Sequence, residues 1–243
     1  MEFGLISGSN LFTSRVLNFF RKMELKPMFI IQTSRERSFF KRFIFRLKKY
    51  GFISTIAWII NSLSLRSKTN INYSKEYNTV NIDSTDQIET VLKKFKPYFM
   101  INTSSDIIPQ SALDIPQFGT IAAHPGILPE YTGLSSLHWQ ICDGKIPGFS
   151  IFKLDGKIDG GPIIYKKYIN PKNGESFFKY RNRFMYYSSY YLALISKLIV
   201  LYPHKVKINN ASNINYSSRG LKNNKTKKLF DNNWEKITNL RNS

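Results

Sequence analysis

Residues 118–165 read FGTIAAHPGILPEYTGLSSLHWQICDGKIPGFSIFKLDGKIDGGPIIY, and this stretch decides the fold. It contains three short apolar runs, each of a length typical of a strand. The runs span residues 119–122, 148–153 and 162–168. Between the first two, a loop rich in Pro and Gly (125–133) leads into a helix expected over 134–142. Strands that alternate with loops and helices predict an α/β domain.

The amino-terminal part of the chain extends this pattern. Residues 2–6 predict a buried strand, residues 11–23 a helix and residues 27–32 a second strand. A strand, helix and strand in this order favour a parallel sheet. Further strands are expected over 78–82 and 97–101, and further helices over 85–95 and 176–201. We expect one domain over 1–202 and a weakly structured, basic, Asn-rich extension over 203–243.

The charge of the chain is large but uneven. The 243 residues include 36 Lys and Arg against 16 Asp and Glu, a net charge of +20. Taken alone, this value favours nucleic acid or an anionic membrane as a partner. However, residues 97–162 hold six acidic and three basic residues, a net charge of −3, so the rest carries +23. Because the motif-rich centre is acidic, we expect no specific nucleic-acid partner. The basic residues elsewhere in the chain would attract a small anionic substrate, which is the expected partner.

Three features bear on the cellular compartment. Cys142 is the single cysteine, which excludes an intramolecular disulfide and fits a reducing environment. The first ten residues, MEFGLISGSN, lack the basic and apolar segments of a secretory signal. The longest apolar stretch, 52–65, is shorter than the ~20 residues that a membrane-spanning helix needs. A cytoplasmic protein is therefore expected.

Residues 38–51 predict an amphipathic helix with two interpretations. Phe39, Phe43 and Leu47 recur at helical spacing on one face, and Lys and Arg occupy the other. In the first interpretation the apolar face packs on the sheet. In the second, residues 38–65 contact an anionic membrane from the side. Both interpretations stay open.

His124 and Asp159 are the candidate chemical groups of the opening stretch. His124 stands at the carboxyl end of a predicted strand, where ligand sites of open α/β sheets lie. Asp159 precedes Gly-Gly-Pro, a turn into the next strand. A His and an Asp at such junctions can converge, and the carboxylate then favours an imidazolium that donates a proton near neutral pH. No metal site is expected.

The opening stretch also contains a long series of particular residues in a defined order and spacing. This order is His124-Pro-Gly-Ile-Leu-Pro, then Gly133, Trp139, Gly144, Gly148 and residues 158–164, IDGGPII. It resembles the formyltransferase family, whose members use 10-formyltetrahydrofolate and include glycinamide ribonucleotide, methionyl-tRNA and sugar N-formyltransferases. The resemblance covers roughly residues 1–170 and is strongest over 97–168. With the strand pattern, it predicts a Rossmann-like three-layer α/β domain with a mainly parallel sheet, a carboxyl-terminal helix and a basic tail.

The resemblance implies roles for particular residues. His124 and Asp159 match the family's catalytic His and Asp. The residues that match its formyl-donor site are Asp106, Ile107, Ile108, Leu154, Asp155 and Gly156, and those that match a substrate-phosphate loop are Gly8, Ser9 and Asn10. In the implied reaction, an amine attacks the formyl carbon, and protonated His124 stabilises the negative charge on the formyl oxygen. Asp159 keeps His124 charged and helps to move the proton that the amine releases.

One position departs from the family pattern. Two residues before the His the family has Asn, and this chain has Ala122, which cannot donate a hydrogen bond to the oxyanion. Loss of one such donor costs on the order of 10²–10³ in rate. Three interpretations follow: Asn102 or Thr103 substitutes for the missing donor, the chemistry is slow or altered, or the site binds ligands without transferring formyl.

The sequence therefore predicts a folate-dependent N-formyltransferase. The expected acceptor is an amine on a small anionic substrate, an amino sugar of a nucleotide-sugar, with 10-formyltetrahydrofolate as the donor. Methionyl-tRNA formylation is the alternative within this class. The alternative from another class is a catalytically impaired binding or membrane-surface protein on the same scaffold, suggested by Ala122.

Overall fold

The core of the protein is a mixed seven-stranded sheet. The computed structural model describes residues 1–8, 11–33, 73–208 and 224–239. Within these ranges the strand order is β3-β2-β1-β4-β5-β6-β7. The strands are β1 (Phe3–Ser7), β2 (Phe29–Thr33), β3 (Thr79–Ile82), β4 (Phe99–Asn102), β5 (Gly119–His124), β6 (Gly148–Lys153) and β7 (Ile163–Tyr168). The first five pair in parallel, whereas β6 runs antiparallel to both β5 and β7.

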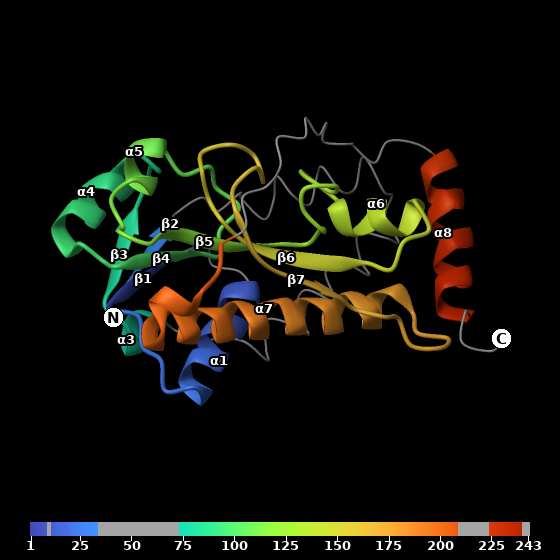
Figure 1. The fold of residues 1–243 in the computed structure, drawn as a ribbon, viewed down its shortest axis with the longest axis horizontal. Coiled ribbons are helices and arrows are strands. Elements are labelled where there is room, and N and C mark those ends of the chain that lie inside the picture. The colour runs from blue at the N-terminus through green and yellow to red at the C-terminus, as the bar shows by residue number, and fades with distance from the viewer. Residues whose placement is uncertain (9–10, 34–72, 209–223, 240–243) are drawn as a thin grey trace.

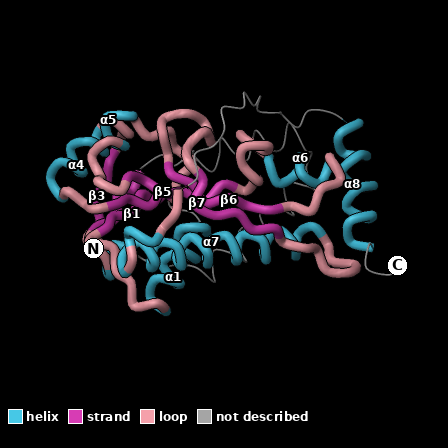
Figure 2. The backbone as a smooth tube through the Cα atoms, viewed as in Figure 1, coloured by secondary structure: helices cyan, strands magenta, loops and turns pink. Residues whose placement is uncertain are grey.

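Helices cover both faces of this sheet, so the domain has three layers (Figure 1). One face carries α1 and α7, which lie side by side, and the other carries α4, α5 and α6 (Figure 2). The helices are α1 (Leu11–Lys22), α3 (Tyr73–Glu76), α4 (Gln87–Phe95), α5 (Gln110–Leu113), α6 (Ser136–Cys142), α7 (Phe177–Leu201) and α8 (Asn224–Asn239), and η1 (Pro203–Lys205) is a 3₁₀ turn. The arrangement confirms the expected α/β fold class.

The two faces of the sheet bury separate apolar clusters because successive strand residues point in opposite directions. Leu5, Ile101 and Ile121 pack on the side of α1 and α7. Ile6 and Met100 pack on the side of α4 and α5. The parallel strands are therefore apolar on both faces, as expected for a sheet covered on both sides.

Helix α7 is the largest cover of the sheet. Ser176 caps its amino terminus by accepting a hydrogen bond from the Lys179 backbone N–H. Its 25 residues are long and apolar enough to cross a membrane by length and composition alone. However, Tyr180, Phe184 and Leu192 are fully buried beneath the sheet. One side of α7 therefore packs in the core of the domain.

Most expected elements occur close to their expected bounds, with three differences. The strand expected to end at Ala122 continues to His124. The short helices α3 and α5 had no counterpart in the sequence prediction. The prediction of a weakly structured extension is wrong for residues 224–239, which form helix α8. The predicted helix 38–51 lies outside the described residues.

Helix α8 packs against α6 and the start of α7 through aromatic contacts. The Trp234 ring lies 4.9 Å from Tyr180 and 5.5 Å from Phe177, centroid to centroid. Asn233 Nδ2 also donates to the Cys142 carbonyl oxygen over 2.7 Å. These contacts attach α8 to the rest of the domain.

Candidate active site

His124 is the last residue of β5 and is 7% exposed. Its ring faces Phe152 of the neighbouring strand β6, with ring centroids 6.5 Å apart and edge-to-face geometry. Ala122, two residues earlier, points to the same face and contacts Phe152 as well. This is the face covered elsewhere by α4 and α5. His124 thus lies at the carboxyl end of the parallel strands, as the sequence predicts.

Asp159 comes from the loop between β6 and β7 and meets His124. Its Oδ1 lies 3.3 Å from His124 Nδ1, and its Oδ2 accepts a hydrogen bond from the Gly133 N–H over 2.6 Å. Burial by itself would raise the pKa of the Asp159 carboxyl. The hydrogen bond and charge of His124, together with the Gly133 N–H, outweigh burial and hold that pKa below its ordinary value of 3.8. The carboxylate is therefore ionised at neutral pH.

Two buried polar side chains, those of Gln140 and Ser150, hold the loop that follows His124 through hydrogen bonds. Gln140 of α6 donates to the Pro125 carbonyl oxygen over 3.2 Å and accepts from the Gly148 N–H over 2.9 Å. Ser150 of β6 accepts from the Leu128 N–H over 2.8 Å. Because these bonds join the loop to α6 and β6, they fix the position of the loop backbone beside His124.

Asn102 and Thr103 were the two candidates for the hydrogen-bond donor missing at Ala122. The structure places their side chains on opposite faces of the sheet. Thr103 Oγ1 donates to the Ile6 carbonyl oxygen over 2.9 Å and also contacts Thr13 Oγ1 of α1 at 2.8 Å, on the opposite face of the sheet. Asn102 instead pairs in register with Ala122, and side chains of paired residues on parallel strands share a face. Asn102 therefore lies on the same side of the sheet as His124.

The side-chain amide of Asn102 has an available donor group. Asn102 is 8% exposed, and its Oδ1 accepts a hydrogen bond from the Ser104 N–H over 2.9 Å. This bond orients the amide, since Asn oxygen and nitrogen are distinguished by their hydrogen bonds. No partner for the Asn102 NH₂ occurs among residues 1–8, 11–33, 73–208 and 224–239.

The two segments matched to the formyl-donor site lie together. Ile108 is buried in the cluster that Leu154 contacts from the other segment. Asp106 accepts from Thr33 Oγ1 over 2.8 Å, which joins the first segment to the end of β2. Gly156 has a φ of +82°, and a Cβ there would lie 2.2 Å from Gln110 Oε1, so this position favours glycine.

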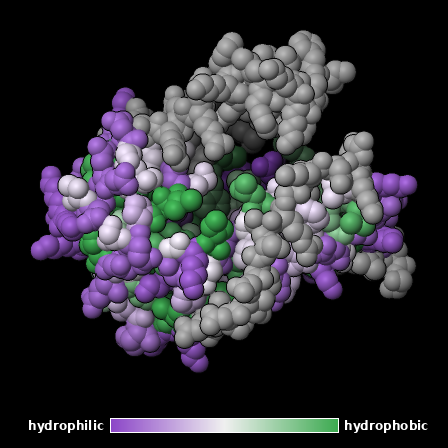
Figure 3. Space-filling view, turned by 90° about the horizontal axis from the view of Figure 1, so that it is seen from above, coloured by the Kyte–Doolittle hydropathy of each residue, from purple (hydrophilic) through white to green (hydrophobic). Residues whose placement is uncertain are grey.

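Exposed apolar side chains surround the same region. Ile107 is 74% exposed, Ile158 next to Asp159 is 71% exposed, and Leu134 next to Gly133 is 85% exposed. Viewed from the side of α4, α5 and α6, hydrophobic side chains gather toward the middle of the molecule, whereas the α4–α5 end is hydrophilic (Figure 3). A surface that offers apolar side chains beside backbone groups fits a flat, partly apolar ligand.

The predicted phosphate loop is only partly described. Gly8 follows β1 directly, at the edge where His124 also lies, and α1 begins at Leu11. Ser9 and Asn10 lie outside the described residues. The placement of Gly8 agrees with a loop between a strand and a helix, and the phosphate role stays a prediction.

Sequence reasoning missed Gly133 as a partner of Asp159, and it missed Ser136. Ser136 Oγ lies 2.9 Å from His124 Nε2 and donates to the Gly133 carbonyl oxygen over 2.7 Å. The only sequence signal was a serine next to the expected start of the helix at 134, a position where serine commonly caps a helix instead.

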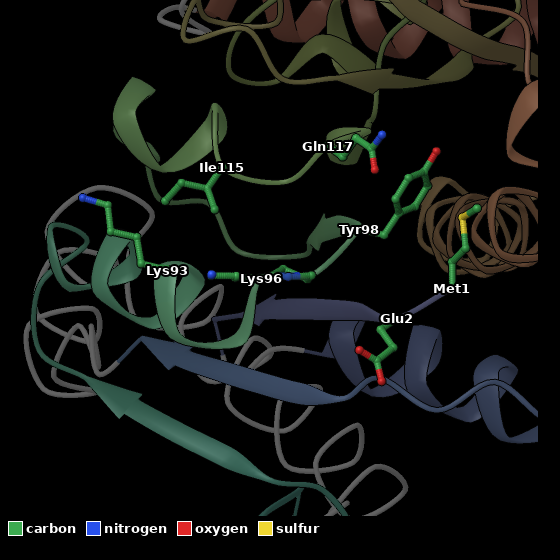
Figure 4. Close-up of a pocket in the computed structure, with 8 residues that line it drawn as sticks. Met1, Glu2, Lys93, Lys96, Tyr98, Ile115 and Gln117 are labelled. Carbon is green, nitrogen blue, oxygen red and sulfur yellow. The ribbon is translucent and has the colours of Figure 1, made fainter.

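A cavity of about 520 Å³ lies at the other end of the sheet (Figure 4). Its lining residues are Met1, Glu2, Lys93, Lys96, Pro97, Tyr98, Ile115 and Gln117. They surround the start of β4, whereas Asn102 and His124 stand where β4 and β5 end. This cavity is therefore separate from the candidate site. Among the described residues, no group of three or more His, Cys, Asp or Glu side chains is placed to hold a metal ion.

Comparison with known proteins supports the family resemblance. The sequence profile of the family "Formyl transferase" matches residues 58–194, more than half of the chain. A mitochondrial 10-formyltetrahydrofolate dehydrogenase of Mus musculus is 34% identical over 83 residues, which cover 34% of this chain and 9% of that protein. A methionyl-tRNA formyltransferase of Malacoplasma penetrans is 30% identical over 105 residues, covering 41% of this chain and 33% of that protein. The matches thus span a third or less of these relatives.

Solved structures share the fold at low sequence identity. Glycinamide ribonucleotide transformylase 1 from Symbiobacterium toebii superimposes with a TM-score of 0.60 and 14% identity, covering 87% of this chain and 94% of that one. A sugar N-formyltransferase from Shewanella sp FDAARGOS_354 gives a TM-score of 0.59 and 14% identity, covering 91% and 77%. The expected formyl donor of the family agrees with the dehydrogenase relatives, which carry 10-formyltetrahydrofolate in their names. The chain belongs to the formyl transferase family.

Proposed function

We propose that this protein transfers a formyl group from 10-formyltetrahydrofolate to the amine of a small anionic acceptor, an amino sugar carried on a nucleotide. The observation that supports transfer most directly is the contact between His124 Nδ1 and Asp159 Oδ1 at the carboxyl end of β5. An imidazole held by an ionised carboxylate is a group that can stabilise negative charge and exchange protons.

The residues around this pair fit the formyl donor. The backbone of 106–108 and 154–156 would hold its flat ring system, and the exposed apolar side chains of Ile107 and Ile158 would cover it. The donor supplies a formyl group on nitrogen, which an amine can attack. Closure of this apolar surface over the ligand would exclude water from the reacting atoms.

His124, Asp159 and Asn102 would then divide the work of the transfer. When the acceptor amine attacks, negative charge develops on the formyl oxygen, and the positively charged His124 beside Asp159 stabilises it. The Asn102 NH₂ would donate a hydrogen bond to the same oxygen in place of the side chain missing at Ala122. Asp159, on the exposed side of the pair, would accept the proton that the amine releases. As the intermediate collapses, the bond between the formyl carbon and the folate nitrogen would break, and that nitrogen would take up the proton to leave as tetrahydrofolate.

The choice of acceptor rests on charge. The net charge of +20 would attract an anionic substrate, and a sugar nucleotide carries its phosphates away from the reacting amine. A sugar N-formyltransferase is among the proteins that share the fold. Methionyl-tRNA is also anionic, so it is the second acceptor to test, and relatives of that name share sequence with this chain.

Turnover with a panel of acceptors tests the proposal. Purified protein is mixed with 10-formyltetrahydrofolate and with amino-sugar nucleotides, glycinamide ribonucleotide or methionyl-tRNA, and release of tetrahydrofolate and the mass of the formylated product are measured. His124→Ala should abolish turnover and leave donor binding intact. His204→Ala is the matched control because His204 is exposed on η1, far along the chain from β5.

The outcomes separate the alternatives. Preferential formylation of methionyl-tRNA would replace the amino sugar as acceptor. Donor binding by the wild-type protein without turnover for any acceptor would instead support a binding protein on this scaffold.

A further inference from the structure

His124 belongs to a closed ring of hydrogen-bonded groups. His124 Nδ1 meets Asp159 Oδ1 at 3.3 Å, and Asp159 Oδ2 accepts from the Gly133 N–H over 2.6 Å. The carbonyl oxygen of Gly133 accepts from Ser136 Oγ over 2.7 Å, and Ser136 Oγ returns to His124 Nε2 at 2.9 Å. One glycine thus holds the carboxylate by its N–H and the serine by its carbonyl group.

The direction of each hydrogen bond in the ring follows from its partners. A hydroxyl group has one hydrogen, and Ser136 gives it to the Gly133 carbonyl oxygen. Ser136 Oγ can therefore only accept from His124 Nε2. The Tyr131 carbonyl oxygen, 2.7 Å from the same nitrogen, is also an acceptor. His124 Nε2 must then carry a hydrogen.

This direction distinguishes the ring from a nucleophile triad. Serine, histidine and aspartate meet in the same order when a serine hydroxyl donates to the histidine that activates it. Here the serine hydroxyl points to a carbonyl oxygen, and Ser136 is only 1% exposed. Ser136 is thus placed to hold His124 and not to attack a substrate.

The packing around Ser136 leaves no space for a side chain at Gly126. A Cβ on Gly126 would lie 2.7 Å from Ser136 Cβ, 2.9 Å from His124 Nε2 and 2.3 Å from the Tyr131 carbonyl oxygen. Any side chain at Gly126 would therefore displace these groups and break the ring of hydrogen bonds. Ser135 adopts a φ of +66° directly before Ser136, which turns the chain into α6 at this point.

We infer that Ser136 is a positioning residue: it fixes the orientation of His124 through Nε2 and couples it, through Gly133, to Asp159. The consequence for catalysis rests on the proposed function. The orientation of the His124 imidazole does not depend on the proposed function, because it follows from the hydrogen-bond distances alone.

Nitrogen NMR of the imidazole groups tests this inference without turnover. The chain has three histidines, so His138→Asn and His204→Asn assign the His124 signals. In the wild-type protein, His124 Nε2 should carry a slowly exchanging hydrogen. A wild-type Nε2 without hydrogen would overturn the inference, since Ser136 would then be its donor.

Variants test the coupling. In Ser136→Ala the exchange of the Nε2 hydrogen should accelerate and its chemical shift should move, and Ser136→Cys should restore part of the signal. If formyl transfer is established, kcat should fall on the order of 10²-fold with KM for both substrates nearly unchanged. Ser135→Gly is the matched control because it removes a neighbouring exposed hydroxyl at a position that suits glycine.

The results distinguish two failures. An unchanged Nε2 signal in folded Ser136→Ala, or labelling of Ser136 by a sulfonyl fluoride, contradicts the positioning role. Absence of turnover in the wild-type protein with the expected NMR signals contradicts only the proposed function.

Discussion

Asp159 links the stability of the site to its chemistry. Its carboxyl pKa lies below 3.8 because hydrogen bonds and charge from His124 and Gly133 outweigh the effect of burial. A group whose pKa is lowered by folding stabilises the folded state above its ordinary pKa. That contribution disappears as the pH falls through the lowered pKa of the folded protein.

Asp159→Asn should therefore act in two ways. At pH 7 it should lower the free energy of unfolding by about 1.5 to 3 kcal/mol, the range for a hydrogen bond to a charged group. It should also reduce formyl transfer by roughly 10²–10⁴-fold, the usual contribution of a proton-transferring group. Urea denaturation at pH 7 and below pH 3.8 measures the first effect. A stability difference that does not shrink at the lower pH would contradict the assigned charge.

Asn102 is the second residue whose role can be measured. Asn102→Ala should lower kcat on the order of 10²–10³-fold because it removes the proposed donor to the formyl oxygen. Adding Ala122→Asn to this variant should recover activity, since the two positions are paired in register on β4 and β5. Asn81→Ala, on the exposed position of β3, is the control. Full activity in Asn102→Ala would show that another group fills the role.

Sequence and structure agree best at single residues where a motif carries the signal. His124 and Asp159 were identified because each stands in a distinctive order of glycines and prolines, and the structure brings them together. Ser136 could not be found this way, because its role depends on a ring closed by Gly133 in three dimensions. The choice between Asn102 and Thr103 likewise required knowing which face of the sheet each side chain occupies.

At the scale of elements, the sequence predicted the strands, the helices and a mainly parallel sheet, but not which strand is reversed. Short apolar runs identify buried strands, and they do not tell whether a strand is parallel to its neighbour. The reversed direction of β6 is therefore visible only in the structure. Helix α8 was missed because a tail rich in Asn and Lys hides three anchors at helical spacing, Phe230, Trp234 and Ile237.

Docking of α8 should depend on pH through His138. The His138 ring packs 4.9 Å from Phe177 and 5.3 Å from Phe230, centroid to centroid. Burial, and then the charge of Arg181, hold the pKa of His138 below its ordinary value of 6.5. The undocked state therefore takes up a proton first, and docking weakens as the pH falls below 6.5.

Hydrogen exchange measures this effect. Protection of the α8 backbone amides, corrected for intrinsic rates, should decrease between pH 7 and pH 5. His138→Leu cannot be protonated and should lose the dependence on pH. Equal protection at both pH values in the wild-type protein would remove His138 as the cause.

At the scale of the whole molecule, the charge is segregated from the site. Residues 97–162 carry a net charge of −3 within a chain of +20. The positive surplus carried by the rest of the sequence attracts anions over a distance that depends on salt. The surplus therefore bears on which partners approach, and the chemistry depends on residues that contribute little to it.

We propose peripheral membrane contact through residues 38–65 as one use of this surplus. Sedimentation with vesicles that contain anionic lipid should show binding that decreases as salt is raised. Replacing Lys41, Arg42, Lys48 and Lys49 with Gln should weaken it. Replacing Lys222, Lys225, Lys227 and Lys228 with Gln instead removes the same number of charges and is the control for charge alone. Binding that is insensitive to salt, or equal loss in both variants, would contradict a specific contact.

Strand β7 ends the described sheet and has a consequence for solubility. A strand at the edge of a sheet offers unpaired backbone groups to the edge of another molecule. Along β7, Lys166 and Lys167 are both exposed and point to opposite faces of the sheet. Pairing with a second strand would bring these charges against another backbone and cost their hydration. The two lysines therefore oppose fibrous self-association of this sheet, and replacing them with valine should promote aggregation.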